Sequence, residues 1–258
     1  AAAACLLVAL GLAVVLGRWA REHHEGAPDT VIGGGVWEGA TRVFRSRYLL
    51  YACLLMLCHN LASTFLYNGL AVLVDRGIEG FAARTEFFSY VDLAVQVIAF
   101  SLQFFITARL VRRAGMPRTL VLVPALLAFC FVLLGSSLGL VLFAAVQVVQ
   151  RALNYGVLGP TKEMLFTVVD RETRYKCKNF IDTVVYRGSD VAASWLFRGF
   201  VNLGWSIGQM AWAYLPLMAA WAWGAWRLGA LYEAFRESGE ASPGDAPPAG
   251  RNRVPSSV

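Results

Sequence analysis

Long apolar stretches alternate with short charged stretches along most of the chain. An α-helix needs about 17 to 25 mostly apolar residues to cross the roughly 30 Å of hydrocarbon in a bilayer. Seven stretches have that length, near residues 1–17, 48–74, 84–108, 119–137, 139–159, 180–203 and 208–229. The pattern therefore predicts an all-α fold, a polytopic transmembrane helix bundle with seven spans.

Four of the predicted spans carry polar residues at intervals of three and four, which places the side chains on one face of a helix. These residues are His59, Asn60, Ser63, Thr64, Tyr67 and Asn68 in the second span; Ser89, Asp92, Gln96 and Gln103 in the third; Gln147, Gln150, Arg151 and Asn154 in the fifth; and Asp182, Tyr186, Arg187, Ser189 and Asp190 in the sixth. The other spans have no ionisable residue in their apolar centres. Polar stripes inside a membrane predict faces turned toward other helices or toward water.

The composition argues against a soluble enzyme. Residues of the set AVILMFWYC make up 57% of the 258 residues and charged residues only 16%, whereas about a quarter of the residues in soluble domains are charged. The five cysteines form no C-x-x-C pair, and the sequence has no P-loop or dinucleotide-binding glycine motif. We therefore expect no structural disulfide, no metal site and no cofactor.

The basic residues are unevenly divided between two sets of loops. Eighteen of the 23 Lys and Arg residues fall in loops 18–47, 109–118 and 161–178 and in the C-terminal tail, whereas the opposite side has only Arg76 and Arg84. The positive-inside rule makes these three loops and the C-terminus cytoplasmic. Orientation in a lipid bilayer, predicted to be a bacterial inner membrane, explains the net charge of +6, and we expect no binding to nucleic acid.

Two segments outside the spans also follow a pattern. Residues 36–47 place Val36, Trp37, Ala40, Val43 and Phe44 on one helical face. This favours an amphipathic helix on the cytoplasmic leaflet, and a disordered linker is the alternative. The C-terminal tail has no apolar periodicity, so we expect it to be disordered.

The ionisable residues inside predicted spans include three aspartates and three arginines. They are Asp92, Arg151, Asp182, Arg187, Asp190 and Arg198. Facing lipid at the bilayer centre costs about 2.5 to 3.5 kcal/mol for each, and the sum exceeds the stability of most proteins. These residues must therefore face one another or water. They either pair to hold helices together or line a solute cavity; Arg198, off the main stripe, favours the structural role.

The order of polar and apolar spans resembles the major facilitator superfamily. If the first span is the sixth helix of a longer protein, helices 7, 8, 10 and 11 are polar, and these line the cavity of that superfamily. The resemblance implies a last helix of an N-terminal half with a linker (1–46), a six-helix C-terminal transport half (47–236) and a disordered cytoplasmic tail (237–258). The remaining N-terminal half of the same polypeptide would precede Ala1.

A second resemblance covers about 30 residues, Gly159 to Asp190. Pro160 to Met164 read PTKEM; the charged segment Asp170 to Lys178 ends in K-x-K; and a helix then begins with Ile181 and Asp182. This series resembles the C-terminal half of the bacterial and plastid ATP/ADP translocase family, in particular its bacterial facilitator-like branch. The resemblance implies a secondary active transporter that exchanges or imports nucleotides or related organophosphates by alternating access.

If the substrate is an anion, the polar residues of the spans can be given expected roles. Lysine and arginine neutralise phosphate charge, so Lys162, Arg151 and Arg187 are the expected anion contacts. Further substrate-binding residues are expected to be Asn154, Gln150, Tyr186 and Asn60. Expected coupling or gating residues are Asp92, Asp182, Asp190, Glu163 and His59.

Several of these roles have structural alternatives. Lys162 and Glu163 could form a local gate pair, or Lys162 could only reach the interface. Tyr155 and Tyr186 could stack on a base or pack against neighbouring helices, and His59 could be a buried hydrogen-bonded histidine.

Two other functions remain open. One keeps the fold and makes the protein a proton-coupled porter of another small solute. The other is a membrane-embedded enzyme acting on lipid phosphates, against which the absence of paired carboxylates with metal spacing counts. We expect the chain to be a carrier and not an enzyme.

Overall fold

The computed structural model describes residues 11, 15, 16, 36–137, 139–169 and 171–238. The chain divides into two compact units, 1–33 and 34–258, and the description below concerns the second. Nearly all of the predicted first span, the linker before residue 36 and the tail from residue 239 lie outside the described residues.

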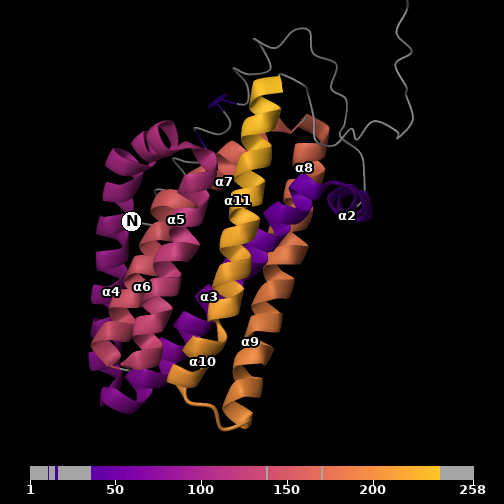
Figure 1. Cartoon of the computed structure of the whole chain (residues 1–258). Helices are drawn as coiled ribbons and strands as arrows, with labels where there is room; N and C mark the ends of the chain where they lie inside the picture. The colour runs from indigo at the N-terminus through magenta and orange to yellow at the C-terminus, as the bar shows by residue number, and fades with distance from the viewer. Residues whose placement is uncertain (1–10, 12–14, 17–35, 138, 170, 239–258) are drawn as a thin grey trace, which may run out of the picture. The chain divides into compact units, whose positions relative to one another are not determined.

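The described part of the second unit consists of helices and short connections, without a β-strand (Figure 1). The α-helices are α2 (Val36–Arg45), α3 (Arg47–Gly77), α4 (Phe81–Ser101), α5 (Ala108–Ser136), α6 (Leu140–Leu153), α7 (Gly159–Leu165), α8 (Arg171–Phe180), α9 (Tyr186–Asn202), α10 (Ile207–Ala213) and α11 (Leu215–Ser238). Three π-helical turns, η1 (Leu102–Thr107), η2 (Asn154–Leu158) and η4 (Ile181–Val185), and one 3-10 turn, η3 (Phe166–Val168), continue these helices. The prediction of an all-α fold is confirmed.

Three helical stretches of the described chain are long and apolar enough to cross a membrane: Arg47–Gly77, Phe81–Ser136 and Leu140–Val168. They contain the predicted second, third, fourth and fifth spans almost entirely, so the structure is consistent with a membrane protein. The predicted total of seven spans is not confirmed. The sixth is helical, but α9 carries Arg187, Asp190 and Arg198 among its 17 residues. The seventh is divided between α10 and α11.

The stretch Phe81–Ser136 is interrupted at Gly115. Its φ of 78° and ψ of 169° are not helical, and in Figure 1 the chain bends over between α4 and α5. The helix resumes at Met116, whose N–H donates to Glu233 Oε1 of α11 at 3.0 Å. The turn therefore combines a glycine-specific conformation with a hydrogen bond donated to a neighbouring helix.

The core lies where α3, α5, α6 and α11 pack together. Phe65 of α3 is fully buried, and its ring centroid lies 5.4 Å from that of Phe131 and 4.7 Å from that of Tyr214. The exposed apolar residues of α4 and η1 include Tyr90, Leu93, Val97, Phe100 and Phe104. An apolar surface of this kind is expected of a helix in contact with lipid.

The predicted amphipathic helix near residues 36–47 is present as α2 and packs against α8. Val43 is buried and Phe44 is 70% exposed, so the apolar residues of α2 are not all in the same environment. Arg42 Nη1 donates to Thr173 Oγ1 of α8 at 2.8 Å. Protein contacts therefore hold part of α2, and its location on a leaflet stays a prediction.

We predict that Gly115→Ala lowers the free energy of unfolding by about 1–2 kcal/mol, because an L-residue is strained at positive φ. A Cβ there would also lie 2.6 Å from Glu233 Oε1. Thermal unfolding in detergent measures the effect. Gly188→Ala is the control, because Gly188 lies within α9 and has open space around its Cβ position. Equal melting temperatures for both variants would contradict the prediction.

Candidate functional site

Two adjoining cavities lie among the helices that carry polar stripes. The first, here called the central cavity, has a volume of about 620 Å³. It is lined by His59, Asn60, Ser63, Thr64, Tyr67 and Asn68 of α3, Phe88 and Asp92 of α4, Gln147, Gln150 and Arg151 of α6, Asn154 and Tyr155 of η2, and Tyr186, Asp190 and Ser194 of α9. The four predicted polar stripes thus contribute to one cavity.

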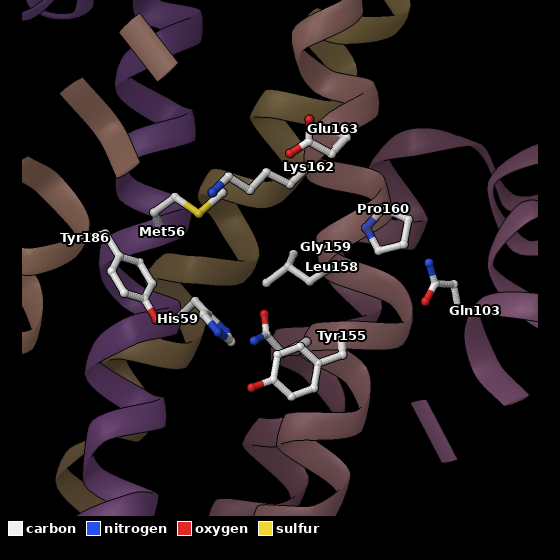
Figure 2. Close-up of a pocket in the computed structure, with 11 residues that line it drawn as sticks. Met56, His59, Gln103, Tyr155, Leu158, Gly159, Pro160, Lys162, Glu163 and Tyr186 are labelled. Atoms are coloured by element: carbon white, nitrogen blue, oxygen red, sulfur yellow. The ribbon is translucent and has the colours of Figure 1, made fainter. Parts of the chain in front are cut away.

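The second cavity, here called the Lys162 cavity, has a volume of about 510 Å³ (Figure 2). It is lined by Met56, His59, Gln103, Asn154, Tyr155, Leu158, Gly159, Pro160, Lys162, Glu163 and Tyr186. Four of these residues, His59, Asn154, Tyr155 and Tyr186, also line the central cavity. The two cavities therefore meet at these side chains.

The wall formed by α6 and η2 follows directly from sequence spacing. Gln147, Gln150, Arg151 and Asn154 recur at intervals of three and four, so they share one helical face, and all four line the central cavity. The two glutamines are almost completely buried, with 3% and 1% exposure. Within the described part of the chain, Oε1 of Gln147 and both Oε1 and Nε2 of Gln150 have no hydrogen-bond partner.

The opposite wall is held by hydrogen bonds between α3 and α9. Asn60 Nδ2 donates to Asp190 Oδ1 at 2.7 Å and to Ser189 Oγ at 2.8 Å. Thr64 Oγ1 donates to the same Asp190 oxygen at 3.3 Å. Asn60 is therefore occupied with positioning Asp190, which lines the central cavity.

The cations of both cavities are paired with carboxylates. Arg151 of α6 forms an ion pair with Asp92 of α4, and Lys162 Nζ of α7 lies 2.7 Å from Asp182 Oδ1 of η4. Lys178 Nζ of α8 lies 2.7 Å from Glu163 Oε2. A phosphate bound in either cavity would compete with a carboxylate for its cation.

Side-chain directions agree with this pairing. Figure 2 shows Lys162 extending from α7 toward the side of its cavity where Met56 of α3 is drawn, with Glu163 drawn above it. Lys162 and Glu163 therefore bind separate partners, Asp182 and Lys178, and do not bind each other. The alternative in which the two neighbours form one local pair is not what this structure contains.

The three π-helical turns all supply residues of the site. Gln103 belongs to η1, Asn154 and Tyr155 belong to η2, and Asp182 belongs to η4. Such turns are rare and are concentrated at functional sites, because the extra residue changes which side chains face inward.

Pro160 gives a physical reason for the turn at η2. Proline has no N–H, so the carbonyl of Gly156, four residues earlier, lacks its α-helical donor. Thr107 of η1 supplies one instead: its Oγ1 donates to Gly156 O at 2.5 Å. The helix of Pro160 is thereby bonded to η1 at the level of the Lys162 cavity.

The structure brings together most, though not all, of the expected site residues. Asn60, Asp92, Gln150, Arg151 and Asp190 line the central cavity; Lys162 and Glu163 line the Lys162 cavity; His59, Asn154 and Tyr186 line both; and Asp182 holds Lys162. Arg187 is exposed on α9 and lines neither cavity. Arg198, expected to be structural, is also exposed on α9 and makes no ion pair with the described residues. The role of each residue stays a prediction.

Several residues of the site were not among the expected ligands. Gln147 lies on the predicted stripe, and its spacing from Gln150 was a usable signal. Gln103 also belongs to a predicted stripe. Thr107 has no such signal, because its partner is a backbone carbonyl 49 residues away.

No protein-family model matches the chain, and no curated protein and no solved structure is significantly similar to it. Among the described residues, no three His, Cys, Asp or Glu side chains are grouped as a metal site requires.

We predict that Thr107→Val lowers the free energy of unfolding by about 1–3 kcal/mol, because the buried Gly156 carbonyl loses its donor while side-chain volume is kept. Chemical unfolding in detergent measures this loss. Thr85→Val is the control: Thr85 is exposed and donates only to Phe81 O of its own helix, at 2.9 Å. A loss of similar size in both variants would show that the hydrogen bond between η1 and η2 contributes no more to stability than one within an exposed helix.

Proposed function

We propose that this chain is the transport part of a secondary carrier that works by alternating access, with its solute bound in the central cavity. One observation carries the proposal: polar side chains of α3, α4, α6, η2 and α9 converge on a cavity of about 620 Å³ inside an otherwise apolar bundle. Polar groups at membrane depth are costly unless a solute, water or another helix meets them. A cavity of this volume suits a small-molecule ligand.

The proposed cargo is a nucleotide or related organophosphate. Support comes from Lys162, which lies in the PTKEM segment and whose side chain lines the Lys162 cavity. Within the described chain, its ammonium pairs with one carboxylate, that of Asp182, at 2.7 Å. A phosphate oxygen can replace that carboxylate, since both are charged acceptors of the same donor.

The proposed architecture is that of the major facilitator superfamily. The remaining wall of the cavity would come from an N-terminal half of the same polypeptide, and α8 with its basic residues would face the cytoplasm of a bacterial cell. Support comes from the order of polar and apolar helices, since α3, α4, α6 and α9 line the central cavity and α5 and α11 do not.

Counterflow of labelled ATP or ADP in proteoliposomes containing the full-length polypeptide tests this function. We predict uptake that depends on internal nucleotide, and a KM about tenfold or more higher for Lys162→Ala, because one charge-assisted hydrogen bond to cargo is lost. Arg113→Ala is the control, since Arg113 is exposed and lines neither cavity.

The opposite results are equally clear. The absence of nucleotide counterflow beside a working phosphate-ester control would refute the proposed cargo. Unchanged kinetics for Lys162→Ala would remove this residue from the site.

A proton-coupled porter is the second candidate, and the charges of the central cavity favour it. The charged side chains of the described chain that line this cavity are two carboxylates, Asp92 and Asp190, and one guanidinium, Arg151. The cavity therefore holds carboxylates that can bind a proton or a cationic solute, and protonation of Asp92 would also release its partner Arg151.

If protons drive uptake, Asp92→Asn should abolish accumulation driven by a pH gradient and retain exchange without a gradient, because an amide cannot carry a proton. Uptake into proteoliposomes with and without an imposed gradient distinguishes the two activities. Asp75→Asn is the matched control, since Asp75 also pairs with an arginine, Arg84, and lines neither cavity. Full gradient-driven accumulation by Asp92→Asn would exclude Asp92 as the proton carrier.

A further inference from the structure

We propose that Gln150, assisted by Gln147, forms a subsite for a planar group that presents a hydrogen-bond donor beside an acceptor, as amides, lactams and nucleobase edges do. This inference rests on the proposed function in one respect, that the central cavity binds a solute. It adds which part of the solute this wall recognises.

The main observation is a buried carboxamide without a protein partner. Gln150 is 1% exposed and lines the central cavity, and both polar atoms of its side chain lack partners within the described chain. Gln147 Oε1, one helical turn earlier on the same face, also lacks a partner. Buried polar atoms are nearly always hydrogen-bonded in folded proteins, so these atoms point to a ligand.

The chemistry of a carboxamide selects the class of ligand. The Gln150 side chain offers an N–H donor and a carbonyl acceptor side by side in one plane. Carboxylate and phosphate offer only acceptors, and an ammonium offers only donors, so each would leave one buried atom of Gln150 unpaired. A group with a donor next to an acceptor pairs with both atoms at once. This matters because leaving a buried polar atom unpaired costs more free energy than a typical hydrogen bond contributes.

Aromatic residues that line the same cavity as the glutamines suit a flat ligand. Phe88, Tyr155 and Tyr186 line the same cavity from α4, η2 and α9. Aromatic side chains stack on planar rings. The cavity thus offers hydrogen bonds to a ring edge and apolar contact to a ring face.

The position of Lys162 determines the orientation of a ligand that occupies both cavities. Lys162 follows Gln150 by 12 residues, which corresponds to about 18 Å between the Cα atoms along a helix. Because the two cavities meet at His59, Asn154, Tyr155 and Tyr186, an elongated solute can occupy both. Its planar end then lies at Gln150 and its anionic end at Lys162.

Calorimetric binding to the full-length polypeptide in detergent tests the subsite with three probes. Uridine 5′-monophosphate has a planar lactam and a phosphate, ribose 5-phosphate has only the phosphate, and uridine has only the lactam. We expect uridine 5′-monophosphate to bind at least about tenfold more tightly than ribose 5-phosphate, the size expected of a two-point amide contact. Gln150→Met should reduce its affinity to nearly that of ribose 5-phosphate.

Two further variants complete the test. Gln147→Met should also weaken the binding of uridine 5′-monophosphate, by a smaller factor. Gln96→Met is the control, because Gln96 is exposed on α4 and lines neither cavity. The melting temperature of Gln150→Met without ligand should be unchanged or higher, since methionine has no buried polar atom to leave unpaired.

The probes separate the failure of this inference from that of the phosphate cargo. If uridine and its monophosphate bind equally and both are weakened by Gln150→Met, the subsite stands and the phosphate cargo fails. The inference is overturned by equal affinities of the monophosphate and ribose 5-phosphate, by unchanged binding in Gln150→Met, or by no binding of either uracil compound. A markedly lower melting temperature for Gln150→Met would also overturn it, since Gln150 would then be a structural group.

Discussion

Every polar group in an apolar bundle needs a partner, and this requirement determines both the fold and the cavity of this protein. The partners come from different helices: Asp92 of α4 pairs with Arg151 of α6, Asp182 of η4 with Lys162 of α7, and Asp190 of α9 with Asn60 of α3. Each contact therefore joins two helices and at the same time lines or borders a cavity. Without them, fewer directional contacts would set the arrangement of these helices.

The same pairing determines what the cavities can recognise. With Arg151 and Lys162 engaged by carboxylates, the described residues of the two cavities offer no free Lys or Arg to an incoming anion. Binding of an anionic solute there requires an exchange of partners. The buried amides of Gln147 and Gln150 need no such exchange. Neutral hydrogen bonds can then select the solute, while a redistribution of charge pairs accompanies its binding and can change how the helices contact one another.

Local spacing explains which features could be predicted from sequence. The intervals between Gln147, Gln150 and Arg151 were sufficient to predict a shared face, because helix geometry alone decides it. The partner of Arg151 was not predictable, since Asp92 is 59 residues away and the contact depends on how two helices pack. The number of spans could not be predicted from the sequence either. The helix α9 forms despite its charges, and helicity alone does not decide whether a helix crosses a bilayer.

The proline after η2 has a mechanical consequence for the bundle. The Gly156 carbonyl bonds to Thr107 of another helix, and the Pro160 nitrogen donates no bond of its own. The helix is therefore less constrained between α6, which holds the two glutamines, and α7, which holds Lys162, than an uninterrupted α-helix would be. A bend at this point would move α7 relative to α6. The distance between the Gln150 amide and the Lys162 ammonium would then depend on the bending angle.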